Sequence, residues 1–178
     1  MDKIGIFCSA STNIDPIYME AARQLGTWIG EQKKTLIYGG SNMGMMEVIS
    51  RAAHQAGAMV MGVVPTKLEE KGAVSDCLDI TFRTENLSDR KDVMLRESDV
   101  LVALPGGVGT LDEVFHIMAA ATIGYHHKKV VLYNVNGFWD GLIDFLNGLE
   151  TKGFTRGLLS SYYAKVNNIE ELIEILKT

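Results

Sequence analysis

The residues best suited to chemistry lie in one glycine-rich segment near the middle of the chain, Leu104-Pro105-Gly106-Gly107-Val108-Gly109-Thr110-Leu111-Asp112-Glu113. Apolar residues precede this segment and an amphipathic run follows it, so we expect it to connect a buried strand to a helix. Glycines let backbone N–H groups approach an anion closely, and a helix N-terminus adds positive potential at the same place. The hydroxyl of Thr110 adds one more donor. These features predict a binding site for a phosphate monoester.

Two common glycine-rich nucleotide motifs are absent. A Walker loop has a lysine directly after its last glycine, and no lysine follows Gly109. The dinucleotide fingerprint follows the first strand, where this chain has Ser9-Ala10-Ser11-Thr12. An oxidoreductase that uses a dinucleotide is therefore disfavoured, and a serine hydrolase has no G-x-S-x-G elbow to support it.

Thr110 and Glu113 allow two interpretations. They match the T-x-x-E pattern of a capping box, in which the two side chains satisfy N–H groups at a helix start. Alternatively, Glu113 contributes to an active site. A carboxylate weakens phosphate binding when it lies beside the phosphate, which favours contact between Glu113 and another part of the substrate, such as its ribose.

Two further segments are candidates for the same cleft. Residues 38–46, Tyr-Gly-Gly-Ser-Asn-Met-Gly-Met-Met, again link a strand to a helix, and they either line the cleft or simply allow close packing. In residues 88–94, Ser-Asp-Arg-Lys-Asp-Val-Met, Ser88 is a plausible N-cap, which places Arg90 and Lys91 in a first turn. Cations there oppose the helix dipole, so the pair is either functional or a solvated pair of charges.

The histidines give weaker signals. His116 lies one turn after Glu113 and either faces the cleft or is packed. The run His126-His127-Lys128-Lys129 has the character of a basic loop before a strand, and neighbouring imidazoles do not provide the geometry of a metal site. We expect no bound metal.

The elements that must position these residues are visible as short apolar runs that alternate with longer amphipathic segments. Apolar residues on consecutive positions indicate strands that are covered on both faces. The five clear runs are residues 4–8, 35–38, 59–64, 100–104 and 130–133, and residues 79–82 and 163–166 are weaker. Helices are expected between the runs, with Asp15 and Asn168 among their N-caps.

This alternation predicts a doubly wound α/β fold whose parallel sheet has helices on both faces. Ligands of such sheets bind beyond the carboxyl ends of the strands, where the candidate segments lie. Residues 66–76 are polar without a clear period, and we expect them to cross the ligand-binding face.

The length and composition fit a single globular domain over residues 1–178. Hydrophobic residues make up 47% of the chain, which excludes disorder, and a net charge of −5 gives no general attraction to nucleic acid or to an anionic membrane. No apolar stretch is long enough for a membrane span. Cys8 and Cys77 show no motif spacing, so we expect free thiols and a cytoplasmic location.

Several motifs resemble those of the Lonely Guy family over nearly the whole chain. Residues 105–113 match its P-G-G-x-G-T-x-x-E signature, and residues 90–94 match its R-K-x-x-M element at the expected distance upstream. The segment Gly39-Gly40-x-x-x-Gly44-x-Met46 resembles its first glycine loop. Residues 124–128 and 134–140 resemble its later segments.

The resemblance implies a Rossmann-like homodimer, with residues 1–178 as a single Rossmann-like nucleotide-binding domain. It also implies a cytokinin riboside 5′-monophosphate phosphoribohydrolase, with no cofactor expected. Such enzymes hydrolyse the N-glycosidic bond of an N6-modified adenosine monophosphate to the free base and ribose 5-phosphate, and some relatives also act on AMP. Members are often labelled lysine decarboxylases. A decarboxylase would require a lysine bound to pyridoxal phosphate, and nothing in this sequence argues for one.

By position, Arg90 and Glu113 correspond to the family's catalytic pair. The substrate- and phosphate-binding residues that the resemblance implies are Lys91, Gly106, Gly107, Val108, Gly109 and Thr110, together with Gly40 and Met94. Glycosidic cleavage passes through an oxocarbenium-like ribose. Glu113 is expected to stabilise that charge, orient the ribose hydroxyls or position water, and Arg90 to hold the phosphate or assist departure of the base.

The sequence departs from the family near the base. The family commonly has Met-His where this chain has Leu87-Ser88. After the signature, the family often has Glu, Thr-Trp and Gln, and the aligned residues of this chain are His116, Ala119-Ala120 and Thr122. In the family, the helix that follows the signature borders the base pocket. The resemblance therefore supports phosphate binding and bond cleavage in this protein more strongly than it supports a particular base. A non-catalytic nucleotide-binding or sensor domain on the same scaffold is the alternative function.

Overall fold

Seven parallel strands in one sheet form the centre of the molecule, and the computed structural model describes all 178 residues. The strands are β1 (Lys3–Phe7), β2 (Thr35–Tyr38), β3 (Met59–Pro65), β4 (Ile80–Thr84), β5 (Val100–Ala103), β6 (Val130–Tyr133) and β7 (Tyr163–Val166). Their order across the sheet is β4-β3-β2-β1-β5-β6-β7, and every neighbouring pair is parallel. The predicted fold is confirmed, including both of the weaker strands.

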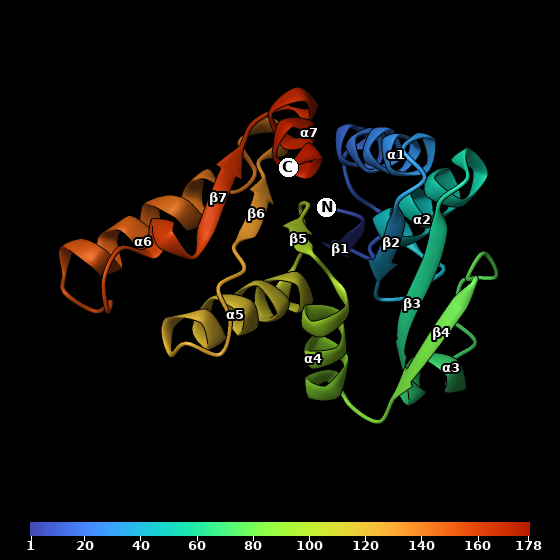
Figure 1. Ribbon diagram of the computed structural model, residues 1–178, viewed down its shortest axis with the longest axis horizontal. Coiled ribbons are helices and arrows are strands. Elements are labelled where there is room, and N and C mark those ends of the chain that lie inside the picture. Colours follow the sequence, from blue (N-terminus) through green and yellow to red (C-terminus); the bar gives the residue numbers. More distant parts are fainter.

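Helices cover both faces of this sheet (Figure 1). They are α1 (Pro16–Glu31), α2 (Gly44–Ala56), α3 (Thr66–Glu70), α4 (Leu87–Glu97), α5 (Val108–Thr122), α6 (Asp140–Thr151) and α7 (Ile169–Lys177). Buried residues of α1, α2 and α7 belong to one apolar cluster, and those of α4, α5 and α6 belong to a second. Two short 3-10 turns, Val135–Gly137 and Leu159–Ser161, complete the connections.

Strand β1 shows why the strands read as continuous apolar runs. Ile4 and Ile6 pack in the cluster with α1, α2 and α7, whereas Phe7 packs in the cluster with α4, α5 and α6. All three side chains are at most 1% exposed. Because neither face of the strand meets water, apolar residues are favoured at every position rather than at every second one.

The helix starts agree with the sequence at two predicted caps and differ at a third. Asp15 accepts a hydrogen bond from the N–H of Ile17 at the start of α1, and Asn168 accepts one from Glu171 in α7, as predicted. The prediction of Ser88 as the cap of α4 is wrong. The cap is Asn86, whose side-chain oxygen accepts from the N–H groups of Ser88 and Asp89 at 2.9 Å.

This shift places Arg90 and Lys91 in the second turn of α4 rather than in its first. The helix dipole acts mainly through the unpaired N–H groups of the first turn, so the conflict between these cations and the dipole is smaller than the sequence indicated.

The polar segment of residues 66–76 lies at the carboxyl ends of the strands, as expected, where it packs on the loop that follows β2. It forms the short helix α3 and then pairs with the loop after β2. The N–H of Asn42 donates to the carbonyl of Ala73 at 3.0 Å, and the N–H of Ser75 donates to the carbonyl of Gly40 at 2.9 Å. The segment therefore covers the glycine-rich loop between β2 and α2. Separately, none of the helices combines the length and apolar character that a membrane span requires.

Candidate active site

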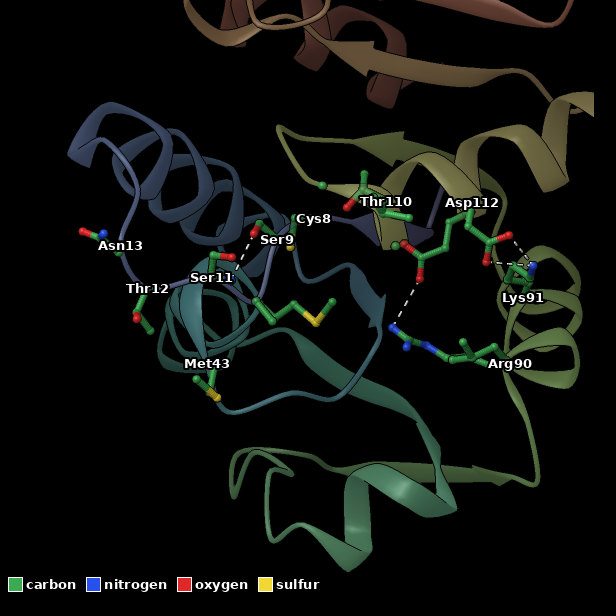
Figure 2. A pocket seen from close by; sticks show the side chains of 17 residues that line it. Cys8, Ser9, Ser11, Thr12, Asn13, Met43, Arg90, Lys91, Thr110 and Asp112 are labelled. Atoms are coloured by element: carbon green, nitrogen blue, oxygen red, sulfur yellow. Dashed lines mark hydrogen bonds and ion pairs between the residues drawn. The ribbon is translucent and has the colours of Figure 1, made fainter.

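A cavity of about 700 Å³ opens beyond the carboxyl ends of β1 and β5. Its wall consists of residues 8–13 after β1, residues 107–110 and 112–113 at the start of α5, and the side chains of Met43, Met46, Leu87, Arg90 and Lys91 (Figure 2). From β1 the chain continues outward through β2, β3 and β4, then returns to place β5 on the other side of β1. The loops after β1 and β5 diverge where the strand order reverses. Open α/β sheets bind their ligands at this point of reversal.

The N-terminus of α5 is open to the cavity. Gly107, Val108 and Gly109 are exposed, and a Cβ added at either glycine would meet no atom within 4 Å. No side chain caps this helix, and its first hydrogen bond runs from the N–H of Leu111 to the carbonyl of Gly107 at 3.0 Å. The preceding N–H groups therefore have no partner within the helix, which makes this end a site for an anion.

The capping-box interpretation of Thr110 and Glu113 is wrong. The N-cap is Gly107, and Thr110 is the third residue of the helix, where it cannot cap. Thr110 is 3% exposed, and its side chain fills the space beside Gly106, where a Cβ would lie 2.0 Å from the Thr110 Oγ1. Gly106 thus makes room for Thr110 and lies outside the cavity wall.

Arg90 and Glu113 meet at the floor of the cavity, and Figure 2 shows the Arg90 side chain pointing into it. The Arg90 Nη2 lies 3.2 Å from the Glu113 Oε1, and the two side chains are 12% and 8% exposed. Gly39 allows this position, because a Cβ there would lie 1.8 Å from the same Nη2. The Nε of Arg90 is buried and has no hydrogen-bond partner, so part of its donor capacity is unused.

Burial raises the pKa of Glu113 from its ordinary value of 4.5 to about 7. The nearby charge of Arg90 acts in the opposite direction, that of Asp112 raises the pKa further, and that of Lys91 lowers it. Near neutral pH the carboxyl group is therefore present in both protonation states. A group with such a pKa can accept and return a proton during a reaction.

Lys91 lies in the cavity wall but is held by a carboxylate of α5. Its Nζ lies 2.8 and 2.9 Å from the two carboxylate oxygens of Asp112, and its side chain is 13% exposed. One turn further along α5, the His116 Nε2 lies 3.0 Å from the Asp92 Oδ1 of α4. His116 is not part of the cavity wall, so its position agrees with the packed alternative.

Two other predicted binding residues lie away from the cavity. Met94 is fully buried in the apolar cluster with α4, α5 and α6. Gly40 has a φ of +78°, and a Cβ there would lie 2.5 Å from the Val64 Cγ2. Both residues support the wall from behind rather than form it.

The sequence interpretation missed the polar loop after β1 as a site element. Ser9, Ser11, Thr12 and Asn13 line the cavity, and Met43 and Met46 do so from the start of α2. The sequence signal that could have indicated this loop was its position directly after the central strand β1. Cys8 lies below the loop, and burial raises the pKa of its thiol, with the charge of Glu113 acting in the same direction. The thiol is therefore protonated and a poor nucleophile.

The site contains no arrangement typical of a metal centre. No three side chains of the metal-binding types His, Cys, Asp and Glu come together anywhere in the structure. Cys8 and Cys77 are both buried and unpaired.

The chain is similar to proteins with a described function. A sequence profile of the family described as "Possible lysine decarboxylase" matches residues 46–176. Cytokinin riboside 5′-monophosphate phosphoribohydrolase LOG7 of Arabidopsis thaliana is 34% identical over 98% of this chain and 81% of its own length. LOG5 of the same plant, with the same description, is 32% identical over 98% of this chain and 77% of its length.

A solved structure of similar fold is the molybdenum cofactor binding protein of Rippkaea orientalis. Its TM-score is 0.74 at 29% sequence identity, over 98% of this chain and 94% of that one. The profile match and the relatives above 30% identity agree with the motifs at residues 90–94 and 105–113. The chain therefore belongs to the Lonely Guy family.

Proposed function

We propose that the protein is a phosphoribohydrolase, which hydrolyses the N-glycosidic bond of an N6-modified adenosine 5′-monophosphate to the free base and ribose 5-phosphate. The observation that carries this proposal is the buried Arg90–Glu113 pair, one helical turn below the open N-terminus of α5. The names of the relatives support it, since they are described as phosphoribohydrolases. AMP itself is a second candidate substrate.

The 5′-phosphate is proposed to bind at the N-terminus of α5. The uncapped N–H groups after Gly107 and the helix dipole attract the dianion without requiring a bound metal. Lys91 contributes positive charge from the side, and Asp112 holds its ammonium group in place. Glu113 follows Thr110 by three residues, about one helical turn, and this spacing supports a contact of its carboxyl group with the ribose rather than with the phosphate.

The reaction breaks the bond between C1′ and the base nitrogen and forms a bond between C1′ and a water oxygen. The ribose becomes oxocarbenium-like in the transition state, and the Glu113 carboxylate stabilises that positive charge and orients the water. One proton of the water passes through the Glu113 carboxyl group to the departing base, so the proton count balances. The Arg90 guanidinium, which lies in the cavity wall, donates a hydrogen bond to the base and favours its departure.

A non-catalytic binding protein is the alternative on the same scaffold. Its support is the similarity to the solved structure of a molybdenum cofactor binding protein, at 29% identity. Such a protein would use the open end of α5 for a phosphate group and would have no need of a carboxyl group with a pKa near neutrality at the floor of its pocket.

The decisive experiment is incubation of the purified protein with AMP and with N6-isopentenyl-AMP, followed by chromatography for free base. We expect base and ribose 5-phosphate in equal amounts from wild type, and none from Glu113→Ala. Glu20→Ala, an exposed substitution on α1, serves as the matched control and should remain active. Tight binding of both nucleotides without product would instead support the binding protein.

We further propose that residues 1–178 act as one nucleotide-binding domain and that the protein is a cytoplasmic homodimer. Exposed apolar residues on and around α5 and α6 support a dimer: Phe115, Ile123, Tyr125, Phe145 and Phe154. The two free, buried thiols support a reducing compartment. Light scattering coupled to size-exclusion chromatography tests the dimer directly, and a mass of one chain would contradict it.

A further inference from the structure

The two helices that supply Arg90 and Glu113 are joined by three ion pairs and by apolar packing around Met94. Within α4, Met94 is the only fully buried residue. On the side of the cavity, α4 and α5 are connected by the pairs Arg90–Glu113, Lys91–Asp112 and Asp92–His116. Of these pairs only Arg90–Glu113 is buried on both sides, and ion pairs with an exposed partner contribute little to stability, so contacts at the carboxyl end of α4 also bear on its position.

Lys128 provides such a contact at the carboxyl end of α4. Its Nζ donates to the carbonyl of Leu95 at 2.7 Å and to the carbonyl of Ser98 at 2.6 Å. The last carbonyls of a helix have no partner within the helix, and a cation beside them also complements the negative end of the helix dipole. Lys128 therefore fixes the end of α4 from outside that helix.

His126 provides the matching contact to α5. Its Nε2 lies 3.1 Å from the carbonyl of Ile117, which is one turn beyond Glu113. Its Nδ1 accepts a hydrogen bond from the N–H of Lys128 at 3.1 Å, so the ring is neutral and carries its proton on Nε2. Burial lowers the pKa of His126, in agreement with the neutral form. The His126 ring is thus hydrogen-bonded to the Lys128 backbone, and the side chains of the two residues contact α5 and the end of α4, respectively.

We propose that His126 and Lys128 are positioning residues for the reaction: together they form a clasp that links α5 to the end of α4 and so holds Arg90 against Glu113. This inference rests on the proposed function, because Arg90 and Glu113 are catalytic only if that function is correct. It gives a role to residues 124–128, which the cavity does not include.

The clasp acts at a distance because α4 is short and rigid. The helix has 11 residues, so a displacement at its carboxyl end is transmitted to Arg90 in its second turn. Misplacement of a catalytic group by about 1 Å can lower a rate about a hundredfold. The N–H groups at the N-terminus of α5, where the phosphate is proposed to bind, belong to α5 itself, and α4 contributes only Lys91 at the side of that site. Loss of the clasp should therefore lower kcat more than it raises KM.

The test compares Lys128 with its neighbour Lys129, which has the same side chain but different contacts. Lys128→Met removes the ammonium group from the clasp, whereas Lys129→Met removes one whose Nζ lies 3.4 Å from the Ser160 carbonyl and touches neither helix. We expect Lys128→Met to lower kcat at least about tenfold with KM changed less than about threefold, and Lys129→Met to retain wild-type values. Lys128→Arg, which keeps a charged donor, should restore most of kcat.

His126 and His127 form a second matched pair. His126→Leu should behave like Lys128→Met, and His126→Gln should retain more activity because its amide can still donate to the Ile117 carbonyl. His127→Leu, at an exposed position, should be close to wild type. All rates are measured at a temperature where circular dichroism shows each variant to be folded. If Lys128→Met or His126→Leu has wild-type kcat under those conditions, the clasp is merely structural and the proposal fails.

A readout that needs no turnover separates this proposal from the proposed function. The carboxyl carbon of Glu113, assigned by comparison with Glu113→Gln, can be titrated by 13C NMR. Arg90 lowers the pKa of Glu113, so a displaced Arg90 should raise that pKa in Lys128→Met relative to wild type and to Lys129→Met. The groups that face Glu113 besides Arg90 are Cys8, Lys91 and Asp112, and none is altered by these substitutions. An unchanged pKa in Lys128→Met would overturn the clasp, whether or not wild type cleaves a nucleotide.

Should Lys128→Met fail to fold, Lys128→Arg and the graded pair His126→Gln and His126→Leu carry the same test. The clasp then predicts that kcat and the Glu113 pKa change together across these variants. Variation in thermal stability alone, with both quantities constant, would contradict it.

Discussion

The two glycine-rich loops of this protein look alike in sequence and differ in structure. Both follow a buried strand and open a helix, one between β2 and α2 and the other between β5 and α5. In the first loop, a Cβ at Gly39, Gly40 or Gly44 would lie within 2.5 Å of another atom. In the second loop, a Cβ at Gly107 or Gly109 would meet nothing within 4 Å.

This difference distinguishes glycines that permit packing from glycines that permit binding. The first loop uses them to admit Arg90 beside Gly39, Val64 beside Gly40 and the backbone of residues 10–11 beside Gly44. The second loop leaves its N–H groups facing an open cavity. A glycine count therefore does not identify a candidate phosphate site, whereas free space at the glycines together with an uncapped helix start in a cavity wall does.

The largest effect is expected from Glu113→Gln, which removes the proton-transferring group at the floor of the cavity. We expect kcat to fall by roughly a thousandfold or more, while AMP still binds because the end of α5 is unchanged. Base release measured by chromatography, with circular dichroism to confirm folding, checks this. Activity within about tenfold of wild type would remove Glu113 from the mechanism.

The next largest effect is expected from Gly39→Ala in the packed loop. The added Cβ would lie 1.8 Å from the Arg90 Nη2 and must displace the guanidinium group. We expect kcat to fall by about a hundredfold, since such displacement misplaces a catalytic group. Gly141→Ala is the matched control, because a Cβ there meets nothing within 4 Å. Equal activity of the two variants would show that Arg90 tolerates movement.

Gly109→Ala tests the open loop and should separate binding from stability. The methyl group enters the cavity at the proposed phosphate position, so we expect KM for AMP to rise by about tenfold. The melting temperature should stay constant or rise, because alanine is a better helix former than glycine by about 1 kcal/mol. Steady-state kinetics and calorimetry check the two expectations. A lower melting temperature with unchanged KM would show that this loop is packed like the first.

The pH dependence of the reaction tests the state of Glu113. Its pKa is raised to about 7, and the active form is proposed to be the carboxylate, which predominates above that value. We expect kcat/KM to fall by roughly eightfold between pH 7.5 and pH 6.0. A profile that is flat over this range, or that rises toward acid, would contradict the assignment.

The same raised pKa has a consequence for stability. An acid that binds its proton more tightly in the folded protein costs stability as pH rises from 4.5, its ordinary pKa, to about 7. The stability of wild type should therefore fall over this range relative to Glu113→Gln, by up to roughly 3 kcal/mol.

Gly40→Ala should have the smallest effect on catalysis. Its φ of +78° and the nearby Val64 side chain both disfavour a Cβ, so we expect a loss of stability of about 1–3 kcal/mol. KM for AMP should stay close to wild type, because Gly40 is not in the cavity wall. Denaturant unfolding and kinetics on the same preparation check this. A large rise in KM without loss of stability would place Gly40 at the substrate after all.

The fold could be predicted because its strands are covered on both faces and its helix caps are local. Residues 35–38, 130–133 and 163–166 were delimited correctly, since apolar runs end where the backbone leaves the sheet. A helix cap depends on one or two residues. Asp15 is the predicted cap of α1, whereas the cap of α4 is Asn86 rather than the predicted Ser88, because several polar residues lie before that helix.

The site could be predicted only in part, because its geometry depends on residues far apart in the sequence. The open end of α5 follows from local glycines, yet the contact of Gly39 with Arg90 and that of Lys128 with Leu95 join distant segments. The loop of residues 9–13 carries no distinctive motif, and only its place after the central strand brings it into the cavity wall.

The most direct test of the central claim is the affinity of Glu113→Gln for AMP and for adenosine, measured by isothermal titration calorimetry. If the N–H groups at the start of α5 hold the phosphate, AMP should bind at least about a hundredfold more tightly than adenosine. The preference should shrink when Gly109→Ala is added and persist when Gly40→Ala is added. Equal affinity for AMP and adenosine would show that the open loop does not bind the phosphate.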